Sequence, residues 1–186
     1  MIGPSWVLFT VMGVRDFPVR IRALNPQSAA VLGMSFLLGA RGLGAIIGPL
    51  VSARWAADSE QRLRRGIFFG YLCVALGYGL LGLAPGVGLA CLCVMIGHFG
   101  GSTVWVFSTT LLQINTDDRF RGRVFAADLG FSMLTIALGA YACGIFLDHG
   151  YSTRAIASST GLLMLAPAAL WLRSMWSARM NLDAAS

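Results

Sequence analysis

Residues 66–116 read GIFFGYLCVALGYGLLGLAPGVGLACLCVMIGHFGGSTVWVFSTTLLQINT and carry no formally charged side chain. A helix needs roughly 20 apolar residues to cross the hydrocarbon core of a bilayer, so this run is too long for one crossing. Pro85 and Gly86 divide it, because both residue types favour turns. The stretch therefore predicts two transmembrane helices, over about residues 67–84 and 88–113.

Working outward, apolar runs on either side predict three more crossings. Residues 29–53 carry one arginine in their middle, and residues 129–147 and 155–172 carry no charge. Each run is close to one bilayer thickness. The apolar segment over residues 2–14 is too short to span unless the bilayer thins around it. We predict an all-α, polytopic membrane helix bundle with five full transmembrane helices plus this short N-terminal apolar segment, in a single membrane domain (residues 1–186).

The composition makes lipid the expected partner. Of 186 residues 56% are hydrophobic and 12% are charged, and the mean hydropathy is +0.72. Soluble domains carry about a quarter charged residues, so a soluble globule is excluded. All basic residues are arginines in short clusters between apolar runs, and no nucleic-acid face is expected. Glycines spaced four apart, such as Gly44 with Gly48 and Gly97 with Gly101, predict close helix packing in lipid.

No enzyme chemistry is expected. All four cysteines fall within predicted spans, and His98 lies within one span whereas His149 lies at the outer end of another, so we predict neither a metal site nor a cofactor. Paired acids on one membrane face and Ser–His pairs at obvious spacing are not found in the sequence, so no catalytic residues are assigned. The residues after the first apolar segment lack a cleavage pattern, and no cleaved targeting segment is expected.

The arginines are divided unevenly between the two ends of the predicted spans. One end collects Arg54, Arg62, Arg64, Arg65, Arg119, Arg121, Arg123, Arg173 and Arg179. The other end collects Arg15, Arg20, Arg22 and Arg154. By the positive-inside tendency the richer end is cytoplasmic. We therefore predict a multi-pass membrane protein with its C-terminus in the cytoplasm.

Several polar residues within the spans are candidates for a substrate or ion pathway. Arg41 lies near the centre of its span, where a guanidinium costs about 2.5–3.5 kcal/mol on insertion scales; the alternative is a structural charge satisfied by carbonyl groups. His98, Ser102, Trp105 and Thr109 share one helical face, which should meet protein or water rather than lipid. Interhelical hydrogen bonding is the alternative for this face. His98 is also a candidate proton carrier, against a packed, hydrogen-bonding histidine.

The next span repeats this spacing with Asp128, Ser132 and Thr135, and Thr135 joins the pathway candidates. Asp128 is predicted near the N-terminal end of its helix, where the helix dipole and Arg121 or Arg123 favour its charge. We hypothesise a cytoplasmic gate whose ion pairs close in one state and separate in the other, against simple cytoplasmic retention charge. The gate candidates are Arg62, Arg64, Arg65, Asp118, Arg119, Arg121, Arg123 and Asp128.

A family resemblance adds to these patterns. Residues 117–125, DDRFRGRVF, follow a glycine- and serine-rich span and precede a small-residue span that ends in GIFLD at Asp148. This run resembles the cytoplasmic link between helices ten and eleven of the major facilitator superfamily, most of all the bacterial efflux branch of the enterobactin-exporter type. The arginine-rich link over residues 54–65 takes the place of the link between helices eight and nine. The resemblance covers nearly the whole chain and matches the C-terminal half, beginning partway through helix seven.

The resemblance implies a function in transmembrane transport, in the bacterial cytoplasmic (inner) membrane. Such a chain would serve small-molecule efflux of a drug, siderophore or metabolite by alternating access, with proton coupling as one option. Family transport uses two six-helix halves, so the chain is expected to be incomplete alone and to need an N-terminal half or a second copy. Two alternatives stay open: a membrane assembly or regulatory protein without transport, or the product of a truncated gene.

Overall fold

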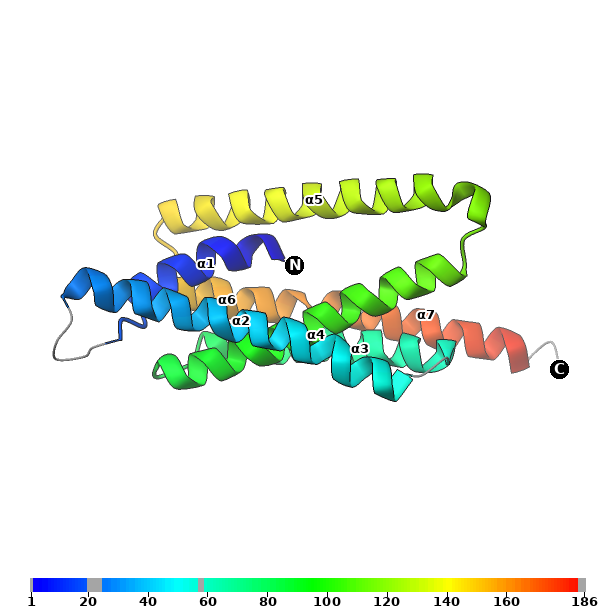
Figure 1. The fold of residues 1–186 in the computed structure, drawn as a ribbon, viewed down its shortest axis with the longest axis horizontal. Coiled ribbons are helices and arrows are strands. Elements are labelled where there is room, and N and C mark those ends of the chain that lie inside the picture. The colour runs from blue at the N-terminus through cyan, green and yellow to red at the C-terminus, as the bar shows by residue number, and fades with distance from the viewer. Residues whose placement is uncertain (1, 20–24, 57–58, 184–186) are drawn as a thin grey trace.

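The computed structural model describes residues 2–19, 25–56 and 59–183, which form helices joined by short turns (Figure 1). In chain order these are α1 (Ile2–Arg15), α2 (Pro26–Ala56), α3 (Glu60–Leu81), α4 (Val87–Ile114), α5 (Asp118–Asp148), α6 (Thr153–Leu163) and α7 (Leu165–Asp183). No strand occurs within these ranges. The all-α prediction is confirmed.

Four of the described segments are long and apolar enough to cross a membrane: α2, α4, α5 and the stretch Thr153–Ser177. Helix α1 has 14 residues and stays short, as expected. The crossing predicted over residues 67–84 corresponds to α3, which does not belong to these four. Its first turns carry Glu60 and several arginines, and it ends at Leu81, so its apolar part is shorter than predicted. The four segments correspond to four of the five predicted spans, and the fifth crossing, at α3, stays a prediction.

Helix ends differ from the predicted span ends where capping residues intervene. Helix α5 begins at Asp118 rather than at residue 129, because the Asp117 side chain accepts a hydrogen bond from the Arg119 N–H at 2.9 Å. Charged residues mark where a helix leaves the hydrocarbon, not where its hydrogen bonds stop. The turn between α3 and α4 contains Pro85 and Gly86, as predicted.

The last predicted span, residues 155–172, is interrupted at Met164 between α6 and α7. Pro167 has no N–H to offer the carbonyl of Leu163, and its ring crowds that carbonyl. The interruption lies one turn before the proline for this reason.

Glycine lets α4 approach both of its main neighbours closely. A Cβ added at Gly44 of α2 would collide with the Met95 carbonyl of α4, and a Cβ at Gly77 of α3 would collide with the backbone of Gly97. Close backbone contact supplies packing energy where lipid offers no hydrophobic force between helices. The predicted close packing is confirmed at Gly44, and α2, α3 and α4 form one packed layer.

Helix α5 lies apart from this layer. It packs along α1 and touches α6, and Cys143 is its buried residue within the described chain. Figure 1 shows α5 running along the upper edge of the bundle, with its N-terminal end at the same end as the C-terminus of the chain. This separation leaves space between α5 and the layer beneath it.

Candidate functional site

A cavity of about 780 Å³ lies between α5 and the layer of α2, α3 and α4. Small-molecule sites typically measure about 300–1,000 Å³ and are mostly apolar, with a few polar groups that fix orientation. Apolar groups such as Val74, Trp105 and Phe131 form much of this wall. The polar side chains in the wall are Arg41, Tyr78, His98, Ser102, Ser108, Asp128, Ser132 and Thr135.

The cavity gathers most of the predicted pathway residues. It is lined by Arg41 of α2, by Thr135 of α5, and by His98, Ser102 and Trp105 of α4. The remaining candidate, Thr109, lies about one turn beyond Trp105 and does not line the space. The polar spacing along α4 therefore predicted which face of the helix lines the cavity. The prediction is wrong only at Thr109, toward the C-terminal end of the helix, which does not line it.

Arg41 brings a charge to the middle of the bundle. It lies as many residues from Pro26 as from Ala56, the two ends of α2. Its guanidinium carbon is 4.0 Å from the ring centroid of Trp6 on α1, a cation–π contact. Its Nε is buried and finds no hydrogen-bond partner in the described part of the chain. The ion pairs identified among those residues also leave Arg41 without an acid.

The hydroxyl groups of the wall donate to their own helices. Ser102 donates to the His98 carbonyl at 2.8 Å, and Thr135 donates to the Phe131 carbonyl at 2.8 Å. Ser108 donates in the same way on α4 at 3.1 Å. A hydroxyl has one hydrogen and two lone pairs, so these three groups offer acceptors to the cavity.

His98 is a packed side chain at the edge of the cavity. Its ring centroid lies 5.5 Å from that of Phe9 and 6.0 Å from that of Tyr78. Its Nδ1 lies 3.1 Å from the carbonyl of Val94 and donates to it, which leaves Nε2 as the acceptor of a neutral ring. These contacts match the packing alternative, and proton coupling through His98 stays a prediction.

Asp128 lines the cavity, but its predicted setting is wrong. Because α5 begins at Asp118, Asp128 lies well inside the helix, beyond the first turn in which the dipole acts. Arg121 pairs with Asp118 at 2.5 Å instead of with Asp128. Asp118 lies three residues before Arg121 on the same helix, a spacing that brings the two side chains together. The Asp128 carboxylate is exposed to the cavity rather than held at a helix end.

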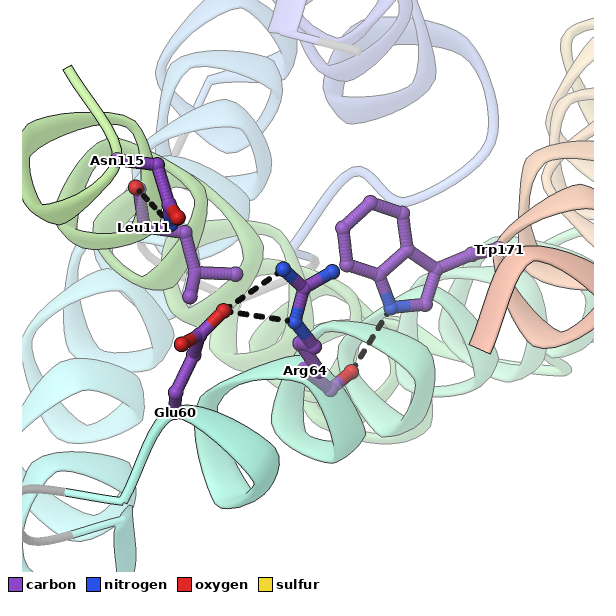
Figure 2. Close-up of polar contacts among 5 residues, drawn as sticks. All are labelled: Glu60, Arg64, Leu111, Asn115 and Trp171. Atoms are coloured by element: carbon purple, nitrogen blue, oxygen red, sulfur yellow. Dashed lines mark hydrogen bonds and ion pairs between the residues drawn. The ribbon is translucent and has the colours of Figure 1, made fainter. Parts of the chain in front are cut away.

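The gate candidates of the first arginine-rich link make local contacts (Figure 2). Arg64 donates from Nε and Nη2 to Glu60 Oε1 at 3.1 and 2.7 Å, and its carbonyl accepts from Trp171 Nε1 at 2.8 Å. Beside them Asn115 Nδ2 donates to the Leu111 carbonyl at 2.9 Å. Arg64 thereby joins α3 to α7 through its backbone, while its charge is satisfied within its own helix.

The other gate candidates show the same local pattern. Arg62 donates to the Trp55 carbonyl at 3.2 Å, and Arg119 lies over the Phe120 ring. Arg65 and Arg123 lie at the same end of the bundle without an ion pair to a described residue. Across the chain segments that the structure describes, no ion pair joins the start of α3 to the start of α5. The ion pairs that the gate hypothesis requires between the two arginine-rich links are therefore not formed among the residues of this structure that are described.

Side-chain contacts also join the helices at the opposite end of the bundle, and the sequence analysis named only one of the residues involved, Arg154, in its count of arginines. Thr153 at the start of α6 donates to Asp16 Oδ2, and Arg154 Nε lies 3.8 Å from Asp16 Oδ1. Arg154 also donates from Nη1 to the carbonyls of Ala84, at 2.9 Å, and Gly82, at 3.4 Å. This clamp (Asp16, Thr153, Arg154 and the turn after α3) joins three segments that are far apart in sequence, so no local pattern could predict it.

Arg154→Ala is expected to lower the free energy of unfolding in detergent by about 1–3 kcal/mol, because it removes the donor to the Ala84 and Gly82 carbonyls and the ion pair with Asp16. The measurement is a denaturant titration followed by circular dichroism. Arg123→Ala, an exposed arginine at the other end, is the control and should change little. Equal stability of Arg154→Ala and the unmodified chain would contradict the role of the clamp.

Comparisons with protein families, with curated proteins and with solved structures find no match to this chain. Within the described residues, no three His, Cys, Asp or Glu side chains gather as a metal site would need. The polar chemistry of the cavity consists of one guanidinium, one carboxylate and the hydroxyl, phenol and imidazole groups around them.

Proposed function

We propose that this chain moves small molecules across the bacterial cytoplasmic membrane, as the C-terminal half of a major facilitator superfamily permease of the efflux type. The observation that carries the proposal is the cavity, in which polar residues of α2, α4 and α5 converge in an otherwise apolar space. Four segments able to cross a membrane give it the setting that a transport path needs. A drug, siderophore or metabolite of ordinary size fits its volume.

A second six-helix unit completes the path in this proposal. The most apolar window of α5 is only 6% buried, and Phe131 beside the cavity is 72% exposed. An N-terminal half or a second copy of the chain would cover this side, and rocking of the two units would open the cavity to each face in turn. In the proposed orientation the arginine-rich end and the C-terminus face the cytoplasm.

Efflux from bacterial cells that lack their own drug exporters tests the proposal. Cells that express the chain, either by itself so that two copies can pair or together with the N-terminal half of an efflux permease, are expected to accumulate less dye than cells with an empty vector. The dyes are ethidium, a cation, and 1-anilinonaphthalene-8-sulfonate, an anion. Ser132→Trp fills the cavity and should restore accumulation, whereas Ser174→Trp on the exposed side of α7 should not. Accumulation equal to the empty vector for both dyes would refute transport by this chain.

A further inference from the structure

The wall of the cavity contains a cation, Arg41, that has no counter-charge among the residues that the structure describes. Arg41 has no acidic partner within the described segments, and its Nε lacks a hydrogen bond there. The guanidinium carbon lies 4.0 Å from the centroid of the Trp6 ring, and this cation–π contact supplies no counter-charge. A guanidinium in a bilayer is costly unless it is paired. A ligand with an anionic group would supply the missing partner.

The neutral polar groups of the cavity wall also favour an anionic ligand. None of them carries a negative charge that could pair with the guanidinium of Arg41. The hydrogens of Ser102 and Thr135 are committed to their own helices. His98 donates from Nδ1 to its helix and leaves only a neutral nitrogen. The guanidinium is therefore the charged donor of this region, and a carboxylate, sulfonate or phosphate matches its planar fork.

Asp128 limits the ligand to one anionic group. It lines the same cavity from α5, and none of the ion pairs among the described residues joins it to Arg41. It lies ten residues after Asp118, at the arginine-rich end of α5, whereas Arg41 lies fifteen residues before Ala56 at the same end of α2. Asp128 is thus nearer that end, where it would repel a second negative charge on the ligand.

We infer that the cavity binds a monoanionic amphiphile, with its anionic group at Arg41 and an apolar or aromatic body that runs along Trp105 and Phe131 toward Asp128. The inference rests on the proposed function and names the solute class of that same site. The volume of about 780 Å³ accommodates a body of drug size beyond the anionic group. The same chemistry belongs to a free organic acid and to an anionic lipid headgroup, which the experiment separates.

The test is binding to the full chain in a nonionic detergent, read from tryptophan fluorescence and calorimetry. Three probes share one body: N-acetyl-Phe-Phe, a monoanion; its C-terminal amide, which is neutral; and N-succinyl-Phe-Phe, with an anionic group at each end. We expect the monoanion to bind about tenfold more tightly than either of the others, as one charge-assisted contact and one repulsion would give. Binding of the monoanion and the amide with equal affinity would overturn the inference, as would the absence of binding by both peptides and by dihexanoyl-phosphatidylglycerol.

Paired variants assign the two charges. Arg41→Gln should abolish the preference for the monoanion over the amide, and Asp128→Asn should abolish the discrimination against the dianion. Arg54→Gln and Asp148→Asn make the same changes on the same helices outside the cavity and should leave both preferences intact. Circular dichroism of each variant verifies its fold, and Arg41→Lys, which keeps the charge, should retain part of the preference. Preferences that survive Arg41→Gln in a folded protein would also overturn the inference.

Short-chain lipids distinguish the source of the anion. Dihexanoyl-phosphatidylglycerol that binds in an Arg41-dependent way, while dihexanoyl-phosphatidylcholine and the peptides do not, assigns the site to an anionic lipid. Binding of N-acetyl-Phe-Phe without binding of either lipid assigns it to a free organic acid. These binding measurements do not depend on transport. Efflux of ethidium together with equal binding of charged and neutral probes would support the proposed function and contradict the inference. Selective binding of the monoanion without efflux would support the inference and contradict the proposed function.

Discussion

Gly44→Leu is expected to separate α2 from α4 and to lower the free energy of unfolding by about 3 kcal/mol. A side chain added at Gly44 points at the Met95 carbonyl and the Phe99 backbone nitrogen of α4. Backbone atoms cannot rotate away as a flexible side chain can, so the whole of α2 would have to move. That movement would also disturb Arg41, three residues earlier on the same helix.

A matched control lies on the same helix. An added Cβ at Gly39 meets nothing within 4 Å, and leucine is a better helix former than glycine by about 0.8 kcal/mol. Gly39→Leu should therefore leave stability unchanged or raise it. Thermal unfolding in detergent, followed by circular dichroism and by retention on a sizing column, gives both values. Equal losses for the two variants would mean that glycine content, and not the contact at Gly44, supports the bundle.

The spans could be predicted because lipid imposes one simple requirement, a long run without charge. That requirement located α2, α4 and α5, and the two turn-forming residues Pro85 and Gly86 located the end of α3. Helix ends were less predictable, because they depend on capping. A single hydrogen bond from the Arg119 N–H to Asp117 extends α5 far beyond its apolar part.

The candidate site was predictable to the extent that it follows helical spacing. His98, Ser102 and Trp105 share one face of α4, and that face lines the cavity. The setting of Asp128 was not predictable, because it depends on where α5 begins and on how far α5 stands from α4. The contact between Asp16 and Thr153 joins residues 137 positions apart, and only the tertiary packing of α1 against α6 brings them together.

Arg41→Leu is expected to reduce efflux of the anionic dye 1-anilinonaphthalene-8-sulfonate at least tenfold, while leaving membrane insertion and stability intact or improved. Removing a guanidinium from the centre of a span removes a cost of about 2.5–3.5 kcal/mol. The cation–π contact with Trp6 that is lost with it contributes about 0.5–2 kcal/mol. The cost of the buried guanidinium exceeds the contribution of the cation–π contact, and the described residues form no ion pair with Arg41 that the substitution would break. The substitution should therefore not destabilise the protein.

The sign of the stability change separates the two interpretations of Arg41. A structural arginine, satisfied by its neighbours, would leave unmet partners when removed and would destabilise the protein. An arginine that binds a ligand has no partner in the protein alone. Its removal therefore eliminates the free-energy cost of an unpaired guanidinium in the membrane and abolishes transport of the ligand. Efflux, insertion efficiency and thermal unfolding of Arg41→Leu should be compared with those of Arg54→Leu, an exposed arginine at the end of the same helix. Loss of stability together with preserved efflux would assign Arg41 to structure, because only the bound solute is proposed to need its charge.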